Sequence, residues 1–182
     1  LSDFNSLGPD IYEIASQQDL DYLARIVNGK TGNTGNNCSD VTFRQTADIA
    51  YSSTSVWDEI DNIDNNFTPI GGYGKSFNGT YDGQGHTISG IRVKKTGTSN
   101  DACSLGLFGY ISGYGTVKNV VLNDANIEGN QNIGGLVGFI DNGSVTDCYL
   151  YHVRVHSTYD NHFRSIIVGN KGGTSLNDPS RS

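Results

Sequence analysis

The chain has 182 residues, a length typical of one domain, and 17% of its residues carry a charge. Its formal net charge is −7 and no cluster of Lys or Arg offsets the acid, which argues against nucleic acid or an anionic membrane surface as partner. No apolar run is long enough to insert into a membrane. Because there is no Met, we expect a mature form or a piece of a larger protein.

The N-terminal third contains one helical signal. Residues 1–10 show no periodicity and are expected to be a linker or a loose terminus. Ser16-Gln17-Gln18-Asp19 then resembles a capping box. Apolar residues follow at helical spacing, and Asn28-Gly29 supplies a stop. The pattern predicts an amphipathic helix of about three turns with its apolar side at Leu20, Leu23, Ala24 and Val27.

From Val41 onward, short alternating runs separated by glycine replace the helical pattern. An acidic loop at 57–66 interrupts the first of these coils. The later coils are predicted at 67–93, 105–127 and 133–155, and Ile166-Ile167-Val168-Gly169 begins a fifth. We expect 11–172 to form one capped domain and 173–182 to be a polar tail.

An internal repeat underlies this division. Gly106-Leu107-Phe108-Gly109 returns 29 residues later (135 − 106) as Gly135-Leu136-Val137-Gly138, and the strand-like runs that follow are 28 apart (145 − 117). A period of this length indicates units that bury their apolar side only by stacking on each other. Extended backward by 29, it predicts that Ile88, Val117 and Val145 share one interior row. The fold class is therefore all-β, a parallel β-helix of four to five coils capped by the N-terminal helix.

These residues resemble the bacterial GLUG-motif family, which is named for Gly-Leu-hydrophobic-Gly. Besides the two copies above, the runs 46–49, 67–71 and 77–88 are similar to that family. The resemblance implies a right-handed parallel β-helix on a secreted or surface-anchored bacterial protein. Such segments occur in adhesin-type surface proteins and in the non-catalytic N-terminal region of IgA-specific metallopeptidases. It implies no catalytic residue.

The residues themselves also favour a protein that is not an enzyme. No His-Glu-x-x-His is present, so this piece lacks a metallopeptidase site. A β-helix polysaccharide lyase or glycosidase would align carboxylates across coils. The predicted outward columns pair no carboxylates: they are Arg92, Val121, Tyr149 and Lys94, Asn123, Tyr151. We hypothesise an extracellular or cell-surface module that adheres to a host protein or glycan. A polysaccharide-cleaving enzyme and a spacer or docking region of a larger secreted protease are the alternatives.

Two groups of residues are candidates for binding. Tyr149 and Tyr151 lie two apart on one strand face, while Tyr110 and Phe139 align with each other, and exposed rings can stack on sugars or anchor a protein interface. The carboxylates of Asp58, Glu59, Asp61 and Asp64 in the acidic loop could hold a structural Ca²⁺, although the EF-hand spacing is absent. No other cofactor is expected.

Three cysteines, at positions 38, 103 and 148, are an odd number without metal-ligand spacing, so they form no disulfide framework. Cys148 falls among apolar neighbours and is interpreted as a small buried thiol. A bond between Cys38 and Cys103 stays open.

Overall fold

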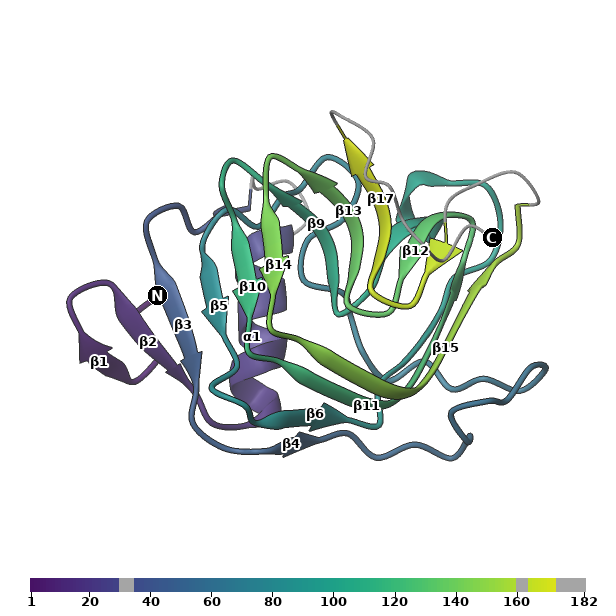
Figure 1. Ribbon diagram of the computed structural model, residues 1–182, viewed down its shortest axis with the longest axis horizontal. Helices are drawn as coiled ribbons and strands as arrows, with labels where there is room; N and C mark the ends of the chain where they lie inside the picture. Colours follow the sequence, from purple (N-terminus) through teal and green to yellow (C-terminus); the bar gives the residue numbers. More distant parts are fainter. Residues whose placement is uncertain (30–34, 160–163, 173–182) are drawn as a thin grey trace.

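The chain folds as a right-handed parallel β-solenoid of about five turns with one helix near its N-terminus (Figure 1). The structure is a computed structural model, and it describes residues 1–29, 35–159 and 164–172. The all-β, parallel, helix-capped architecture predicted from the repeat is confirmed.

The elements follow one another around the solenoid, rung by rung. The first part contains β1 (Ser6–Gly8), β2 (Ile11–Ile14), α1 (Gln17–Asn28), β3 (Thr42–Gln45) and β4 (Ile49–Ala50). The next rung contains β5 (Thr80–Asp82), β6 (Thr87–Ser89), β7 (Arg92–Lys94), η1 (Asn100–Ala102), β8 (Cys103–Leu105) and β9 (Phe108–Ser112). The rung after it contains β10 (Thr116–Lys118), β11 (Val121–Gly129), β12 (Gln131–Gly134) and β13 (Val137–Asp141). The last described rung contains β14 (Ser144–Thr146), β15 (Tyr149–Ser157), β16 (Arg164–Ser165) and β17 (Val168–Gly172).

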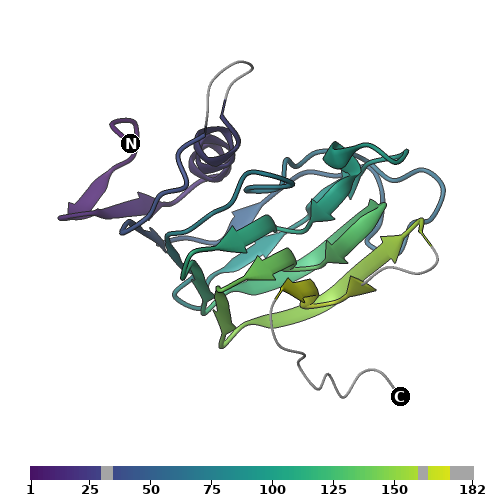
Figure 2. The same cartoon turned by 90° about the horizontal axis from the view of Figure 1, so that it is seen from above.

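Successive rungs pair strand on strand, which gives four sheets that run along the stack (Figure 2). Their orders are β1-β2-β3-β5-β10-β14, β15-β11-β6-β4 with β7 also on β11, β16-β12-β8, and β17-β13-β9. Among the named strands, every pairing is parallel except that of β1 with β2. Because β17 pairs with β13, the run that begins at Ile166 does continue the stack, as expected. The predicted polar tail at 173–182 lies outside the described residues.

The predicted row of Ile88, Val117 and Val145 is wrong in its first member. Val117 does lie opposite Val145, but its partner in the preceding rung is Tyr81, while Ile88 lies opposite Leu122. The step from the β5–β9 rung to the next is 36 residues at the first strand (116 − 80), 34 at the second (121 − 87) and 28 at β8 (131 − 103). The turn 83–86 and the loop 95–102 supply the extra residues. The period of 28 therefore holds from β8 to β12, from β10 to β14 and from β11 to β15, but the step from β12 to β16 is 31 residues (164 − 133).

The glycines of the two repeat copies are required by close packing of the backbone. A Cβ on Gly109 would overlap the carbonyl oxygens of Gly71 and Ser104, and a Cβ on Gly106 would lie 2.8 Å from the carbonyl oxygen of Phe108. Neither glycine has a positive φ, so the demand is for space rather than for a left-handed conformation.

Helix α1 covers the first end of the stack, as predicted (Figure 2). Its N-cap is Ser16, whose hydroxyl accepts from the amide of Asp19, and the Asp19 carboxylate accepts from the amide of Ala15. The buried side comprises Leu20, Leu23, Ala24 and Val27. At the other end, Asn28 bonds the carbonyl of Pro69 at 3.0 Å and the amide of Gly71 at 2.9 Å. Among the described residues, no helix is long and apolar enough to cross a membrane.

The N-terminal residues are more ordered than the expected loose terminus of residues 1–10. Strand β1 forms an antiparallel hairpin with β2. The ring of Phe4 is buried, with its centroid 4.8 Å from that of Tyr22 on the helix and 5.3 Å from that of Phe43 on β3. Aromatic packing between the first rung and the cap therefore fixes this segment.

Candidate binding surface

A long loop between β4 and the next coil lies over the outside of the solenoid, and we call residues 52–66 the strap. Its main anchor is Arg92, whose side chain is only 1% exposed. The guanidinium donates from Nε and Nη2 to the carbonyl oxygen of Ser55 at 3.1 and 2.8 Å. Nη2 also lies 2.7 Å from Oδ1 of Asp124, so one planar group joins the strap to the sheet beneath it.

Three further side chains hold the strap against the sheet. Asn126 donates to the carbonyl of Glu59 at 2.8 Å, Lys94 donates to the carbonyl of Asp61 at 3.1 Å, and Asn66 donates to the carbonyl of Gly90 at 2.9 Å. These contacts join residues 24 to 67 positions apart in sequence, which tie the strap to two different rungs of the stack.

The carboxylates proposed as calcium ligands make separate hydrogen bonds within the strap or are exposed. Asp64 accepts from the hydroxyl and amide of Thr54 and from the hydroxyl of Ser53, and these bonds hold its pKa below the usual range. Glu59 accepts from the amides of Asn62, Asp61 and Ile60, which lowers its pKa in the same way. Asp58 and Asp61 are exposed. Within the described residues, no three His, Cys, Asp or Glu side chains are placed to hold a metal ion. The structure thus does not bring the four carboxylates together, and calcium binding stays a prediction.

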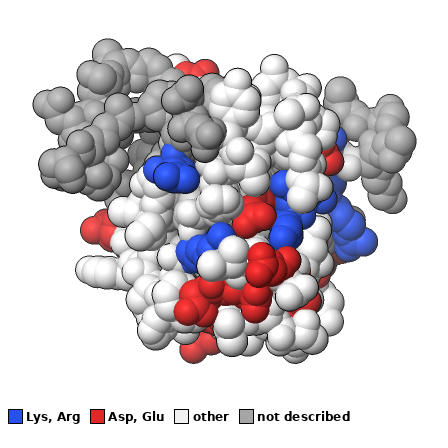
Figure 3. Space-filling model, turned by 90° about the vertical axis from the view of Figure 1, so that its right-hand side faces the viewer, with Lys and Arg blue, Asp and Glu red and all other residues white. Residues whose placement is uncertain are grey.

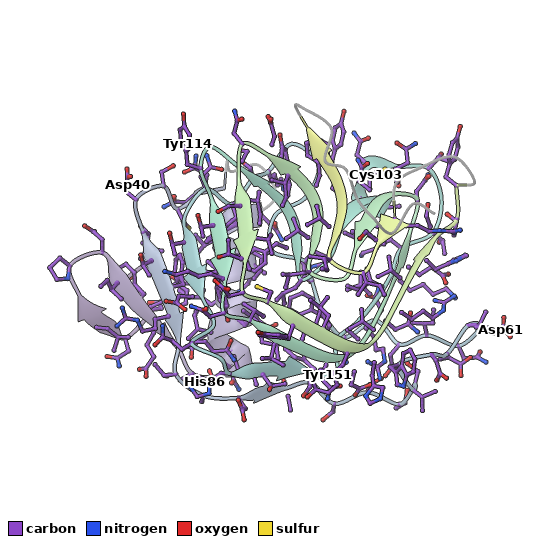
Figure 4. All side chains as sticks on the ribbon, viewed as in Figure 1. Asp40, Asp61, His86, Cys103, Tyr114 and Tyr151 are labelled. Carbon is purple, nitrogen blue, oxygen red and sulfur yellow. The ribbon has the colours of Figure 1, made fainter. Side chains whose placement is uncertain are left out.

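Aromatic side chains gather where the strap meets the last described rung. Tyr149 is 70% and Tyr151 48% exposed on the outer side of β15. His152 follows at a positive φ of 51°, and its ring centroid lies 5.6 Å from that of Tyr151 and 5.5 Å from that of Trp57 in the strap. We call Tyr149, Tyr151, His152 and Trp57 the aromatic face; Figure 4 labels Tyr151 within it.

The other predicted pair lies elsewhere on the solenoid. Tyr110 on β9 and Phe139 on β13 are register partners, with ring centroids 5.1 Å apart and both side chains half-buried. Their alignment is as predicted, but they belong to a different sheet from β15, so the structure does not join them to Tyr149 and Tyr151.

Charged side chains beside the aromatic face neutralise one another. Glu128 is largely buried, with Oε2 3.2 Å from Nη1 of Arg154 and Oε1 3.6 Å from Nζ of Lys94. Arg154 also donates to Oδ1 of Asn126 at 3.1 Å. Figure 3 shows acidic and basic groups interleaved on this side of the molecule. Because Glu128 is paired with Arg154 and Lys94, these groups together produce no strong electrostatic potential of one sign.

Carboxylates on the strands are likewise not paired with each other. In the register of the described strands, Glu13 lies opposite Arg44, Asp82 lies opposite Arg44 and Lys118, and Glu128 lies opposite Lys94 and His156. Asp141 lies opposite Ser112 and Gly172. Two neighbouring carboxylates, the arrangement that glycoside hydrolysis uses, are not built by these ladders.

The three cysteines are free thiols, so the Cys38–Cys103 bond that the sequence left open is not formed. Cys38 and Cys103 are buried and Cys148 is partly buried. Burial raises the pKa of Cys38 to about 11, which keeps this thiol protonated and inert at neutral pH.

The sequence missed three residues of this surface. Arg92 was expected in an outward column beside Val121, but it lies opposite Asn126 and is covered by the strap. Trp57 and His152 meet only because the strap folds back over β15. The one available signal was that the chain's single tryptophan lies in an acidic loop.

Two comparisons with known proteins give matches, and neither match covers the whole chain. The family model described as "The GLUG motif" matches residues 129–150, which include the second Gly-Leu-Val-Gly. The chain is also 36% identical over 101 residues to halomucin of Haloquadratum walsbyi; the match covers 53% of this chain and 1% of halomucin. No solved structure matches the chain significantly.

Proposed function

We propose that this chain is a non-catalytic, surface-associated module of a longer protein, and that it adheres to a host protein or glycan through its aromatic face. The observation that carries the proposal is the exposure of Tyr149 and Tyr151 on a strand held in a stack of parallel rungs. Exposed aromatic rings in fixed positions lose little conformational entropy on binding, which suits them to recognition.

Similarity to the GLUG motif and to halomucin supports a surface-associated setting and an extracellular position. Because the matched region spans only 1% of halomucin, the similarity concerns a module and not the whole relative. Bacterial origin remains part of the proposal. Labelling intact producing cells with an antibody against residues 35–159 tests the position: labelling only after the cells are broken would contradict it.

Adhesion is tested with the purified chain coupled to beads and applied to surfaces that carry host-cell proteins or glycans. We expect retention of the unmodified chain and loss of retention for the double variant Tyr149→Ser/Tyr151→Ser. Tyr114→Ser is the matched control, because Tyr114 is 86% exposed but lies far from Tyr151 (Figure 4). Equal retention of all three proteins would refute the role of the aromatic face.

The non-catalytic part of the proposal is tested separately. The chain is incubated with uncharged and anionic polysaccharides, and new reducing or unsaturated ends are measured. The alternation of carboxylates with basic or neutral residues along the ladders predicts none above the background of a heat-denatured sample. Release of such ends in proportion to the concentration of the chain would instead establish polysaccharide cleavage.

A further inference from the structure

The aromatic face has the spacing of a stacking platform. Tyr149 and Tyr151 are two residues apart on β15, which places their side chains on the same side of the strand, about 6.6 Å apart along it. His152 and Trp57 extend the row of rings toward the strap. The face is thus an elongated row of rings rather than one isolated ring.

The rungs beside these rings present uncharged groups. Tyr149 lies opposite Val121, and Tyr151 lies opposite Asn123. One rung further along the sheet, the corresponding positions are Thr87 and Ser89. The amide and hydroxyls can donate and accept hydrogen bonds without adding charge. A target for this strip therefore combines apolar ring faces with hydroxyl groups.

The surrounding charges select against an anionic target. Arg154 and Lys94, on strands of the same sheet, are both paired with Glu128, and Lys118, three residues before Val121, is paired with Asp82. Arg92 is buried under the strap and paired with Asp124. An anionic polymer would meet no free cation among these groups, and the net charge of −7 would repel it.

The geometry points to an uncharged polysaccharide as the ligand of the aromatic face, with sugar rings stacked on Tyr149, Tyr151 and Trp57. This inference rests on the proposed binding function and names the class of its ligand. Sugars offer both an apolar ring face and equatorial hydroxyls, which matches a row of aromatic rings beside Asn123 and Ser89.

Arg92 acts in this site as a positioning residue. It holds the carbonyl of Ser55, two residues before Trp57, through two bonds of its guanidinium. A lysine cannot reproduce this forked contact. Arg92→Lys should therefore shift the fluorescence of Trp57 and weaken polysaccharide binding together.

The test is affinity electrophoresis of the full chain in native gels that contain a soluble polysaccharide. Dextran, mannan and laminarin serve as uncharged probes, and hyaluronan and polygalacturonate as anionic probes. We expect at least one uncharged probe to retard the chain, and Tyr149→Ala/Tyr151→Ala to weaken that retardation about tenfold or more. Trp57→Ala should also weaken it, while Tyr114→Ala should behave as the unmodified chain. Retardation should be the same at about 50 and about 500 mM NaCl, because no charge pairing contributes.

Three results would overturn the inference. The first is no retardation by any uncharged probe. The second is retardation by an anionic probe that fades with salt. The third is binding of an uncharged probe that the two tyrosine substitutions leave intact. If any of these results is obtained and the beads still adhere to a protein-coated surface, the proposed adhesive function stands and its target is a protein. If Arg92→Lys releases Trp57 without weakening retardation, the positioning role of Arg92 is refuted.

Discussion

Leu122 and Leu150 offer a direct test of the stacked core, because they are the same position in consecutive rungs. Leu122 on β11 lies between Ile88 on β6 and Leu150 on β15, and its side chain is fully buried. Among the described strands, Leu150 has a register partner on one side, Leu122, and it is partly buried. The pair thus compares an interior rung with the last described rung at constant side-chain chemistry.

The expected losses follow from this difference. Replacing a core leucine by alanine costs about 2–5 kcal/mol, and the cost rises when the surroundings cannot collapse into the cavity. Hydrogen-bonded rungs on both sides keep Leu122 from relaxing, so Leu122→Ala should cost about 3–4 kcal/mol. Leu150→Ala removes area that is already partly in water and should cost about 1–2 kcal/mol.

The measurement is urea unfolding of both variants, with the slope m compared to confirm that the unfolding reaction is unchanged. Leu7→Ala is the control, since Leu7 is 41% exposed on β1 and should lose less than about 0.5 kcal/mol. Equal losses for Leu122→Ala and Leu150→Ala would refute the reasoning. They would mean that the last described rung is as well covered in solution as the interior one.

Three other perturbations probe the backbone, the core and the strap. Gly90→Ala should destabilise the chain by more than about 1 kcal/mol in urea unfolding, because Gly90 has φ of 78° and a Cβ would overlap the carbonyl oxygen of Tyr51; Gly97→Ala, at φ of 91° but with open space, should cost less. Val120→Asp places an unpaired carboxylate at a fully buried position, and circular dichroism should show loss of cooperative folding. The pKa of Asp64 is lowered in the folded state, first by the hydroxyl of Thr54. The Asp64 carboxylate therefore stabilises the folded state above the unfolded pKa of about 3.9, and this stabilisation is lost as the pH falls through the folded pKa. Fluorescence of the single tryptophan should change below about pH 4, and Asp64→Asn should show that change at neutral pH; a flat acid titration would contradict it.

Much of the fold could be predicted because the residues that determine it lie close together in the sequence. The cap helix needs only a capping residue, four spaced apolar side chains and a stop, and its observed span ends at Asn28 as expected. The glycines at 106–109 and 135–138 lie where two rungs approach too closely for any side chain. Because successive rungs make similar close backbone contacts, glycine recurs at the same positions of the repeat.

The register of the β5–β9 rung could not be obtained in the same way. The additional residues in 83–86 and 95–102 are polar turn residues with no apolar pattern of their own. Nothing in such a segment fixes how many residues the chain uses before it returns to the stack. A backward step of 29 consequently placed Ile88 beside Val117, where Tyr81 belongs.

The binding surface was predictable to the extent that it depends on strand alternation. The outward exposure of Tyr149 and Tyr151 follows from the period of two along β15. The contributions of Trp57 and Arg92 depend on where the strap folds back, which is decided by hydrogen bonds across as many as 67 residues. Such contacts leave no local pattern, so sequence reasoning assigned the strap only its acidity.

The departures from the repeat are where this solenoid acquires a distinctive surface. A plain rung buries apolar rows inward and presents its turns outward, and such rungs differ little from one another. The strap interrupts the first coil, and it reaches across the stack to place a tryptophan beside the tyrosines of β15. The residues that fix it, Arg92 and Asn126, are the outward positions of two regular strands. Regular rungs thus supply fixed anchor points, and an irregular insertion uses them to build a recognition face. By this logic, deleting the strap should remove Trp57 from the aromatic face, while Tyr149 and Tyr151 stay on β15 and the parallel stack remains folded.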